Sequence, residues 1–230
     1  MFHESKKAEI VPDGLPASRT YDAGCRRCVR LATFLDEVKA EHPAYRCLPV
    51  PPYGDRKARL AIVGLAPGLH GANATGRPFT GDYAGILLYE TLHAYGYASS
   101  PLSRTADDPL TLDDCRITNA VKCLPPANKP LPGEIRNCND YLTADLALVP
   151  EGGAVLALGR IAHEAALLAL GLRRNHFAFA HGARHALPHG RALFDSYHCS
   201  RYNTNTGRLT AAMFRGVFDA IADHLGRARP

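Results

Sequence analysis

One glycine-rich segment constrains this sequence more than any other. It runs from Val63 to Asp82 (VGLAPGLHGANATGRPFTGD), follows an apolar run that predicts a buried strand, and precedes a helical pattern that starts near Tyr83. Its five glycines and two prolines are typical of a shaped loop. Open α/β sheets bind their ligands at the carboxyl ends of their strands. The loop is therefore a candidate active-site segment.

The rest of the chain alternates between predicted strands and predicted helices. Apolar runs predict strands at 59–64, 116–122, 154–158 and 192–197. Helical spacing predicts helices at 31–41, 83–95, 132–149, 161–170 and 209–225. This alternation predicts a three-layer α/β/α fold with a central parallel sheet of four strands. A length of 230 residues suits one such domain, which we expect at 21–230 behind an amino-terminal arm at 1–20.

Charge and hydropathy exclude few partners. The formal net charge of +5 favours an anionic partner only weakly. No apolar run approaches the ~18 residues that cross a bilayer, and the amino terminus lacks the apolar core of a signal peptide. We therefore expect a cytoplasmic protein without membrane contact. In that compartment, seven cysteines favour metal ligation or ordinary thiols over disulfides.

Polar side chains lie in three of the predicted strands or in the loops that follow them. Asp82 closes the glycine-rich loop, Asn119 lies in the second strand, and His198 follows the last one. Because the carboxyl ends of parallel strands meet at one edge of a sheet, we expect the three groups to lie close together. An amide can read a donor and acceptor pair on a ring edge, and a histidine can donate a hydrogen bond where negative charge develops.

These segments resemble the motifs of a known enzyme family. VGLAPGLHGANATGRPFTGD, ITNAVKC and YHCSRYNTNTGRLT are similar to the three motifs of the uracil-DNA glycosylase superfamily, in its family-5 or type-B form. The similarity extends in order from Leu60 to Leu225. It implies an α/β/α fold, a monomer, and a DNA substrate that contains deaminated bases. The implied reaction hydrolyses the N-glycosidic bond of uracil, and of other bases such as hypoxanthine, to leave an abasic site.

The resemblance also implies roles for single residues. Asp82 would position the water or stabilise the sugar cation, Asn119 would bind the flipped base, and His198 would donate to the base carbonyl. Leu65 and Ala66 stand where relatives carry a carboxylate or an amide, so water activation must come from elsewhere. Besides Asn119, the base pocket would be formed by Gly64, Leu65, Ala66, Gly68 and Phe79, with the phenylalanine stacked on the base.

A second group of residues would grip the DNA. The segment at 200–208 (SRYNTNTGR) is rich in hydroxyl, amide and guanidinium donors to phosphate, and Tyr202 could wedge into the base stack. No lysine is placed in the three loops as an obvious Schiff-base nucleophile, so a monofunctional glycosylase is expected, and Lys122 is the one lysine to test. The expected DNA contacts are Arg77, Ser200, Arg201, Tyr202, Asn203, Thr204, Thr206 and Arg208.

Four cysteines form a candidate metal site. Cys25 and Cys28 make a C-x-x-C pair, and Cys123 and Cys138 have 14 residues between them. Four thiolates suit a [4Fe-4S] cluster or zinc, and spacing alone does not choose. The resemblance implies a structural [4Fe-4S] cluster that ties the amino-terminal arm to the loop after the second strand, with zinc less favoured. The remaining cysteines, which we expect to be ordinary thiols, are Cys47, Cys115 and Cys199.

Simpler interpretations stay open for several residues. Phe79 could be a core residue under the loop, and Asp82 could cap the helix that starts at Tyr83, a role compatible with catalysis. Cys199 replaces the proline of the usual motif, which removes a fixed φ and predicts a softer loop. For the whole chain, the alternative is a non-catalytic module that binds damaged DNA. A metal-dependent hydrolase of nucleosides or nucleotides would need more carboxylates in the loops.

Overall fold

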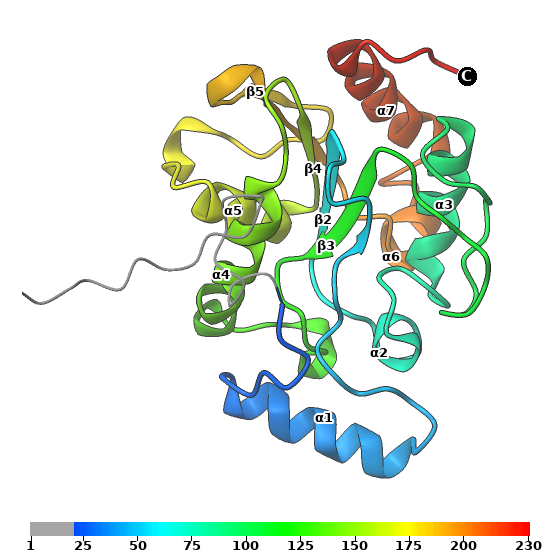
Figure 1. Cartoon of the computed structure of the whole chain (residues 1–230), viewed down its shortest axis with the longest axis vertical. Helices are drawn as coiled ribbons and strands as arrows, with labels where there is room; N and C mark the ends of the chain where they lie inside the picture. Colours follow the sequence, from blue (N-terminus) through cyan, green and yellow to red (C-terminus); the bar gives the residue numbers. More distant parts are fainter. Residues whose placement is uncertain (1–20) are drawn as a thin grey trace, which may run out of the picture.

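The computed structural model describes residues 21–230, so the predicted arm at 1–20 lies outside the described residues. Across these residues, six strands form one sheet in the order β1-β3-β2-β4-β6-β5 (Figure 1). The four inner strands are parallel, which confirms the predicted core of the sheet. They are β3 (Cys115–Asn119), β2 (Leu60–Gly64), β4 (Ala154–Leu158) and β6 (Ala192–Ser196).

The two edge strands were not predicted from the sequence. β1 (Tyr53–Gly54) pairs with β3 and β5 (Arg184–Ala186) pairs with β6, both antiparallel. Strands of two and three residues are too short to show the alternation that marks a strand in a sequence. The sheet is therefore mixed, and its predicted parallel part is flanked by one short antiparallel strand at each edge.

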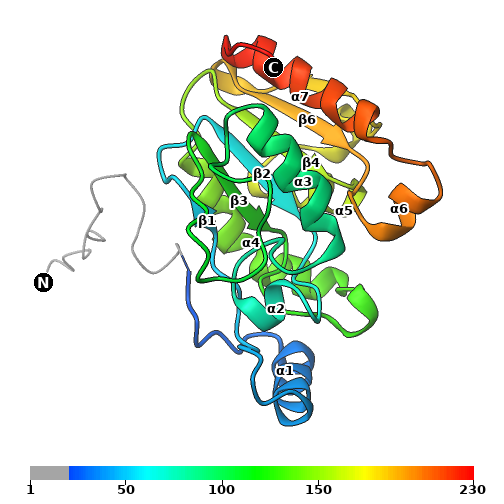
Figure 2. The ribbon, with the colours of Figure 1, turned by 90° about the vertical axis from the view of Figure 1, so that its right-hand side faces the viewer.

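Helices cover both faces of the sheet, which makes the predicted three layers (Figures 1 and 2). Successive side chains of a strand point to opposite faces, so Leu60 and Ile62 pack into one core and Ala61 and Val63 into the other. The first core lies against α3 (Tyr83–Ala94) and α7 (Ala211–Leu225). The second lies against α4 (Pro132–Ala147) and α5 (Arg160–Ala169). Burial on both faces explains why the inner strands are continuously apolar.

A small third cluster attaches α1 (Val29–Glu41) to the end of the sheet. Leu35 and Val38 of α1 pack there against Cys47 and Leu124. Figure 1 shows α1 beyond the end of the sheet. Helical spacing in 31–41 predicted this helix correctly apart from its first two residues. The segment that follows β3 is thereby held against the part of the chain that precedes β1.

Short helical turns occupy segments that the sequence analysis treated as loops. α2 (Ala72–Thr75) lies within the glycine-rich segment and α6 (Arg201–Asn205) follows β6. Helices of four or five residues have no apolar periodicity from which to predict them. The three 3₁₀ turns of the described chain are η2 (Pro126–Asn128), η3 (Arg174–His176) and η4 (Pro188–Gly190). None of the helices in residues 21–230 has the length and apolar composition needed to cross a membrane.

Candidate active site

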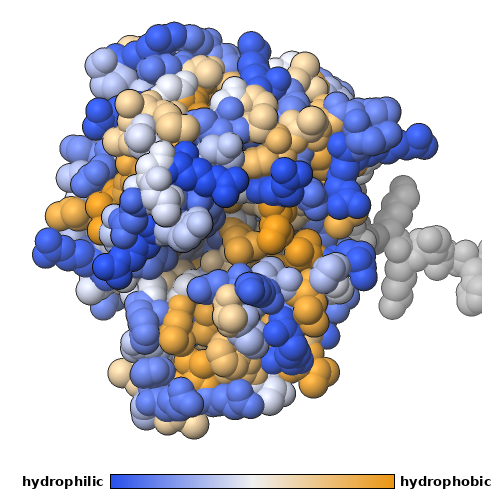
Figure 3. Space-filling view, turned by 180° about the vertical axis from the view of Figure 1, so that it is seen from behind, coloured by the Kyte–Doolittle hydropathy of each residue, from blue (hydrophilic) through white to orange (hydrophobic). Residues whose placement is uncertain are grey.

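A pocket of about 570 Å³ lies where β2, β3, β4 and β6 end. The space-filling view from behind shows a hollow with apolar side chains on this side of the molecule (Figure 3). The structure brings together most of the predicted site in this pocket, since all three predicted catalytic residues line it. The predicted residues that line it are Leu65, Ala66, Gly68, Phe79, Asp82, Asn119, His198, Ser200 and Arg201.

Asp82 is able to serve both as a helix cap and as a catalytic carboxylate. It is the N-cap of α3, where its Oδ1 accepts a hydrogen bond of 2.8 Å from the backbone N–H of Gly85. No hydrogen bond within residues 21–230 engages its other carboxylate oxygen, and the side chain lines the pocket. Burial raises the pKa of Asp82, and the Gly85 hydrogen bond only partly opposes this. The capping bond therefore fixes one oxygen and leaves the other for chemistry.

Gly64 allows the amide of Asn119 to approach the end of β2. The two residues are paired in the sheet, and a β-carbon at residue 64 would lie 2.3 Å from Oδ1 of Asn119 and 2.7 Å from the ring of Phe79. Asn119 is only 3% exposed, yet its Oδ1 has no hydrogen-bond partner in the described part of the chain. A buried acceptor without a partner is costly, and such exceptions need an explanation. A bound ligand that supplies a donor would provide one.

Phe79 and His198 form an aromatic wall beside this amide. Their ring centroids are 6.0 Å apart and their planes are inclined by 29°. Phe79 has a φ of +54°, a strained conformation for a bulky residue, and it is buried. Phe79 therefore lines the pocket and also packs in the core beneath it. The interpretation of Phe79 as a core residue is therefore confirmed, and its stacking on a base stays a prediction.

His198 is neutral at neutral pH. Desolvation in the pocket lowers its pKa to about 4. Its backbone carbonyl accepts a hydrogen bond of 2.8 Å from Nδ2 of Asn203, which holds the end of β6 against α6. A neutral imidazole still has one N–H donor, so His198 can donate a hydrogen bond without bringing a positive charge into the pocket.

The segment at 200–208 contains the short helix α6, which Ser200 caps. Several of its polar side chains form hydrogen bonds within the segment. The Oγ of Ser200 accepts from the backbone N–H of Asn203, and the hydroxyls of Thr204 and Thr206 donate to carbonyls one turn earlier. These three hydroxyls therefore stabilise α6 itself. Tyr202, by contrast, is 71% exposed on the surface of this helix.

A second, more polar groove of about 300 Å³ adjoins the pocket and shares Gly159, Arg160 and His198 with it. Arg160 lies 5.6 Å from the ring centre of Phe179, and Arg208 lies 4.6 Å from that of Tyr197. No carboxylate lines this groove. A guanidinium seated on an aromatic ring is positioned without losing its hydrogen-bond donors.

A third arginine near the pocket, Arg201, also lies over an aromatic ring. Arg201 lies 5.6 Å from the ring centre of Tyr83, and like Arg160 and Arg208 it forms no ion pair within residues 21–230. Sequence reasoning missed Arg160 because the predicted helix began one residue later. Its position directly after the end of the third predicted strand was the signal that could have found it.

Two basic residues are not available to DNA. Arg77 is only 5% exposed, donates to Ser103 at 2.9 Å and pairs with Asp108, so its predicted DNA contact is wrong. Lys122 is buried, and its ammonium lies 3.0 Å from Asp145. Strand β3 was predicted to continue to Lys122, but it ends at Asn119. Lys122 does not line the pocket, and its ammonium is engaged by Asp145.

The four predicted metal-binding cysteines converge. Cys25, Cys28, Cys123 and Cys138 line one small cavity beside α1 and α4. The Sγ of Cys138 accepts from the backbone N–H of Lys122 at 3.3 Å, and the Sγ of Cys28 accepts from Nδ2 of Asn137 at 3.7 Å. Four thiols, two of which accept N–H hydrogen bonds, form a donor set that fits an iron–sulfur cluster. The other described cysteines, Cys47, Cys115 and Cys199, are buried and do not line this cavity.

The fold and the pocket define a protein of the uracil-DNA glycosylase type. Residues 51–222 match the model of the Uracil DNA glycosylase superfamily, and the chain belongs to this family. The resemblance seen in the sequence is thereby confirmed.

The similar proteins include several type-5 uracil-DNA glycosylases. The one from Thermus thermophilus is 50% identical over 198 residues, which cover 84% of this chain and 90% of that protein. The one from Pyrobaculum aerophilum is 41% identical over 206 residues, or 88% of this chain and 89% of that protein. A type-4 uracil-DNA glycosylase from Archaeoglobus fulgidus is 38% identical over 114 residues, 49% of each chain. The similarity to these type-5 proteins is the more extensive one.

Proposed function

We propose that this protein is a monofunctional uracil-DNA glycosylase of DNA base-excision repair. It hydrolyses the N-glycosidic bond of uracil, and of other deaminated bases such as hypoxanthine, and leaves an abasic site. The observation that carries this proposal is the single pocket in which Asp82, Asn119 and His198 meet at the carboxyl ends of three strands. Family membership and the names of the type-5 relatives support the same activity.

The pocket would act on a base that has been turned out of the helix. Phe79 stacks on the base, and the unpaired Oδ1 of Asn119 accepts a hydrogen bond from the imide N–H of uracil while Nδ2 donates to a carbonyl. As the bond to the sugar breaks, electrons move into the base, and His198 donates to the carbonyl oxygen that gathers negative charge. A base that leaves as a stabilised anion needs no protonation by a strong acid.

Asp82 acts on the other side of the bond. The sugar becomes cationic as the base leaves, and a nearby carboxylate stabilises that cation. The same carboxylate oxygen can orient the water that then attacks the sugar, since the capping bond to Gly85 leaves it free. Leu65 and Ala66 line the pocket without polar side-chain atoms, so Asp82 supplies the charge that relatives place in the first motif.

The DNA backbone is gripped around the pocket mouth. Arg160, Arg201 and Arg208 are free of ion pairs in the described chain and rest on aromatic rings, so they bind phosphates with little loss of side-chain freedom. The exposed ring of Tyr202 is placed on α6 to fill the gap in the base stack. The polar residues that present these groups are Ser200, Asn203, Thr204 and Thr206.

The four cysteines hold a [4Fe-4S] cluster with a structural role in this proposal, and zinc is the alternative. The cluster would supply a crosslink between the segment before α1, the segment after β3 and helix α4. No step of base removal involves it.

The test is base removal from a defined DNA strand. End-labelled oligonucleotides with one uracil, one hypoxanthine or only normal bases are incubated with wild type, Asp82→Ala and the exposed control Asp107→Ala. We expect breaks at uracil only after alkali treatment, at wild-type rates in the control and at rates reduced by orders of magnitude in Asp82→Ala. Binding of the uracil strand without base release would favour the alternative, a non-catalytic module that binds damaged DNA.

A further inference from the structure

Arg77 is a buried arginine of the glycine-rich segment, and the proposed mechanism makes no use of it. It does not line the pocket. Its guanidinium donates to the hydroxyls of Thr80 and Ser103, at 2.9 Å each, and forms an ion pair with Asp108. Removing an arginine from water is costly unless its N–H groups find partners. These four side chains form a clamp that joins the glycine-rich segment to residues 103–108, which lie outside the three motifs.

The clamp is rigid because its far side is itself held. Asp108 accepts a hydrogen bond of 2.9 Å from the backbone N–H of Arg104. The hydroxyl of Ser103 lies 2.7 Å from that of Thr80, and the carbonyl of Ser103 accepts from the backbone N–H of Gly81 at 3.1 Å. Thr80 is fully buried, so these bonds are shielded from water. The glycine-rich segment is therefore fixed directly before the N-cap of α3.

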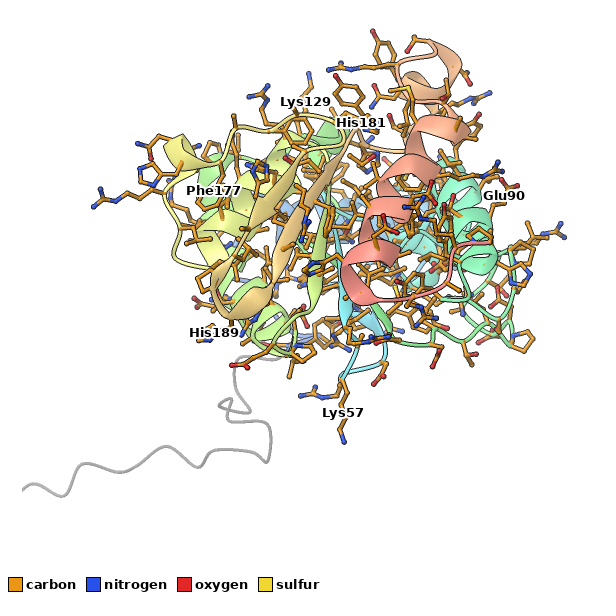
Figure 4. All side chains as sticks on the ribbon, turned by 90° about the horizontal axis from the view of Figure 1, so that it is seen from above. Lys57, Glu90, Lys129, Phe177, His181 and His189 are labelled. Carbon is orange, nitrogen blue, oxygen red and sulfur yellow. The ribbon has the colours of Figure 1, made fainter. Side chains whose placement is uncertain are left out.

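Phe79 lies between two fixed residues and has a conformation that needs them. Its φ of +54° places it in the left-handed region, where a residue with a β-carbon is strained. Thr80 holds the chain on one side. On the other side, the carbonyl of Pro78 accepts a hydrogen bond of 2.9 Å from the hydroxyl of Tyr89. Tyr89 lies on the buried side of α3, and Figure 4 shows the neighbouring Glu90 on the outer side. The surroundings therefore impose the position of the Phe79 ring.

We propose that Arg77 is a positioning residue for base removal, which keeps Phe79 and Asp82 in the pocket by clamping the segment that carries them. The other half of the clamp is Asp108, so a residue outside the three motifs contributes to the reaction. This inference rests on the proposed function, because it assumes that Phe79 stacks on an extruded base. Arg77 itself does not touch the DNA and acts only through the chain that it holds.

The first test compares two DNA ligands that differ in the extruded group. One duplex carries 2′-fluoro-2′-deoxyuridine, whose glycosidic bond resists hydrolysis, and the other carries a tetrahydrofuran abasic-site analogue, which has no base. Arg77→Gln should bind the first duplex about 10-fold more weakly, since a stacked base contributes that much, and the second like wild type. The matched control is Arg174→Gln, which changes an exposed arginine paired with Glu164 and should bind both duplexes like wild type.

The rate of base release separates positioning from stability. All proteins are compared with full iron content and below their melting temperatures. At saturating enzyme, single-turnover release of uracil by Arg77→Gln should fall by about 100-fold, because a small displacement of Asp82 costs that much. A variant that was only less stable would release uracil at the wild-type rate under these conditions, and that result would overturn the inference.

A double-variant cycle tests whether Arg77 acts through Phe79. Phe79→Ala removes the ring that stacks on the base. In that background, Arg77→Gln should cause no further loss of affinity for the uracil analogue. Additive losses would show that the two residues act independently and would contradict the positioning role.

Asp108→Asn tests the clamp from its other side and keeps the inference testable if Arg77→Gln does not fold. It should show the same selective loss of affinity for the uracil analogue, with a smaller fold-change, whereas the exposed control Asp107→Asn should bind like wild type. Wild-type binding of both duplexes by the clamp variants, or equal losses on both duplexes, would overturn the inference. Release of uracil from ordinary uracil-containing DNA by the wild type is measured separately, and its absence would contradict the proposed function instead.

Discussion

Gly64 and Asn119 are so close that only glycine fits at residue 64: a β-carbon there would lie 2.3 Å from the amide oxygen of its strand partner. Gly64→Ala should therefore displace Asn119 and the ring of Phe79 from the pocket. We expect single-turnover base release to fall by about 100-fold, because small displacements of binding groups cost that much. Gly216→Ala in α7, where a β-carbon meets open space, is the control and should keep full activity. Wild-type rates in Gly64→Ala would contradict the role given to Asn119.

Asp82 should limit activity at low pH. Burial raises the pKa of Asp82, so base release should fall as pH decreases on a limb above the ordinary aspartate value of about 3.9. Asp82→Asn keeps the cap on α3 and should lose this limb together with most of the activity. His198, whose pKa is lowered to about 4, stays neutral over most of the same range. A pH–rate profile of both proteins checks this, and an unchanged acid limb in Asp82→Asn would contradict it.

The burial of Asp82 should also destabilise the folded protein at neutral pH. A carboxyl group whose pKa is raised on folding destabilises the folded protein above its unfolded pKa, since the unfolded chain ionises more easily. Asp82→Asn should therefore melt at a higher temperature than wild type at pH 7. The difference should shrink as pH approaches the unfolded value of about 3.9. Melting curves at several pH values decide this, and a lower melting temperature for the variant at pH 7 would contradict the burial argument.

The arginines seated on aromatic rings should control salt dependence. Each phosphate contact contributes about 0.9 to the slope of log affinity against log salt concentration on duplex DNA. Arg160→Gln and Arg208→Gln should each reduce the magnitude of that slope by about 0.9, the contribution of one phosphate contact. The maximal rate of base release at saturating enzyme should change little. Arg174→Gln is the matched control, because Arg174 is exposed and already paired with Glu164 at 2.9 Å. Unchanged slopes in both pocket variants would exclude the adjoining groove as a phosphate site.

His163 should stabilise the fold in a pH-dependent manner. Its Nδ1 lies 2.7 Å from a carboxylate oxygen of Asp195 and its Nε2 lies 3.0 Å from the carbonyl of Phe177. Both partners only accept, so the ring is doubly protonated when both bonds form. Burial lowers the pKa of His163, but the hydrogen bond and charge of Asp195 outweigh it and raise the pKa overall.

Because the pKa of His163 is raised in the folded protein, its contribution to stability depends on pH in a defined direction. The stabilisation is complete below the unfolded pKa of about 6.5 and is lost as pH rises through the folded value. His163→Gln should therefore lower the melting temperature most at pH 5 to 6, and less above the folded pKa. The exposed His176→Gln is the control. An equal loss of melting temperature for His163→Gln at every pH would show that the imidazolium is not the source.

The cysteine cavity should contain iron. Cys138→Ser should lose most of the roughly four iron atoms per chain expected of a [4Fe-4S] cluster, together with the visible absorbance, and should melt at a lower temperature. Cys115→Ala changes a buried cysteine that does not line the cavity, so it should keep its iron. Elemental analysis of the purified proteins checks both. Zinc in the wild type would favour the alternative metal.

Local patterns were enough to predict the inner sheet and the chemistry at its edge. The inner strands are continuously apolar, the long helices are periodic, and Asn119 and His198 were placed by the strands at whose ends they lie. The two edge strands, α2 and α6 were missed because segments of two to five residues are decided by tertiary pairing. The first four residues of β2 illustrate the reliable part of the prediction. They alternate between the two cores, as strand geometry requires.

Two of the errors at the site have the same physical cause. Arg77 was expected to contact DNA and Lys122 to lie beside the active-site loops, since basic side chains are usually exposed. Each is instead buried against a carboxylate more than twenty residues away in sequence, Asp108 and Asp145 respectively. Asn128 was missed because only the folded chain places it beside the pocket, whereas the position of Arg160 just after a predicted strand was a usable signal. Long-range partners of this kind leave no local pattern in a sequence.

The central claim is that this pocket removes uracil from DNA with Asp82 as the charged group. Its most direct test is to quantify free uracil released from a uracil-containing duplex under single-turnover conditions, for wild type and Asp82→Asn at pH 7. The account predicts free uracil and an abasic site in equal amounts with wild type, and a rate lower by several orders of magnitude in the variant. No free uracil from iron-replete wild type, or equal rates for both proteins, would contradict it.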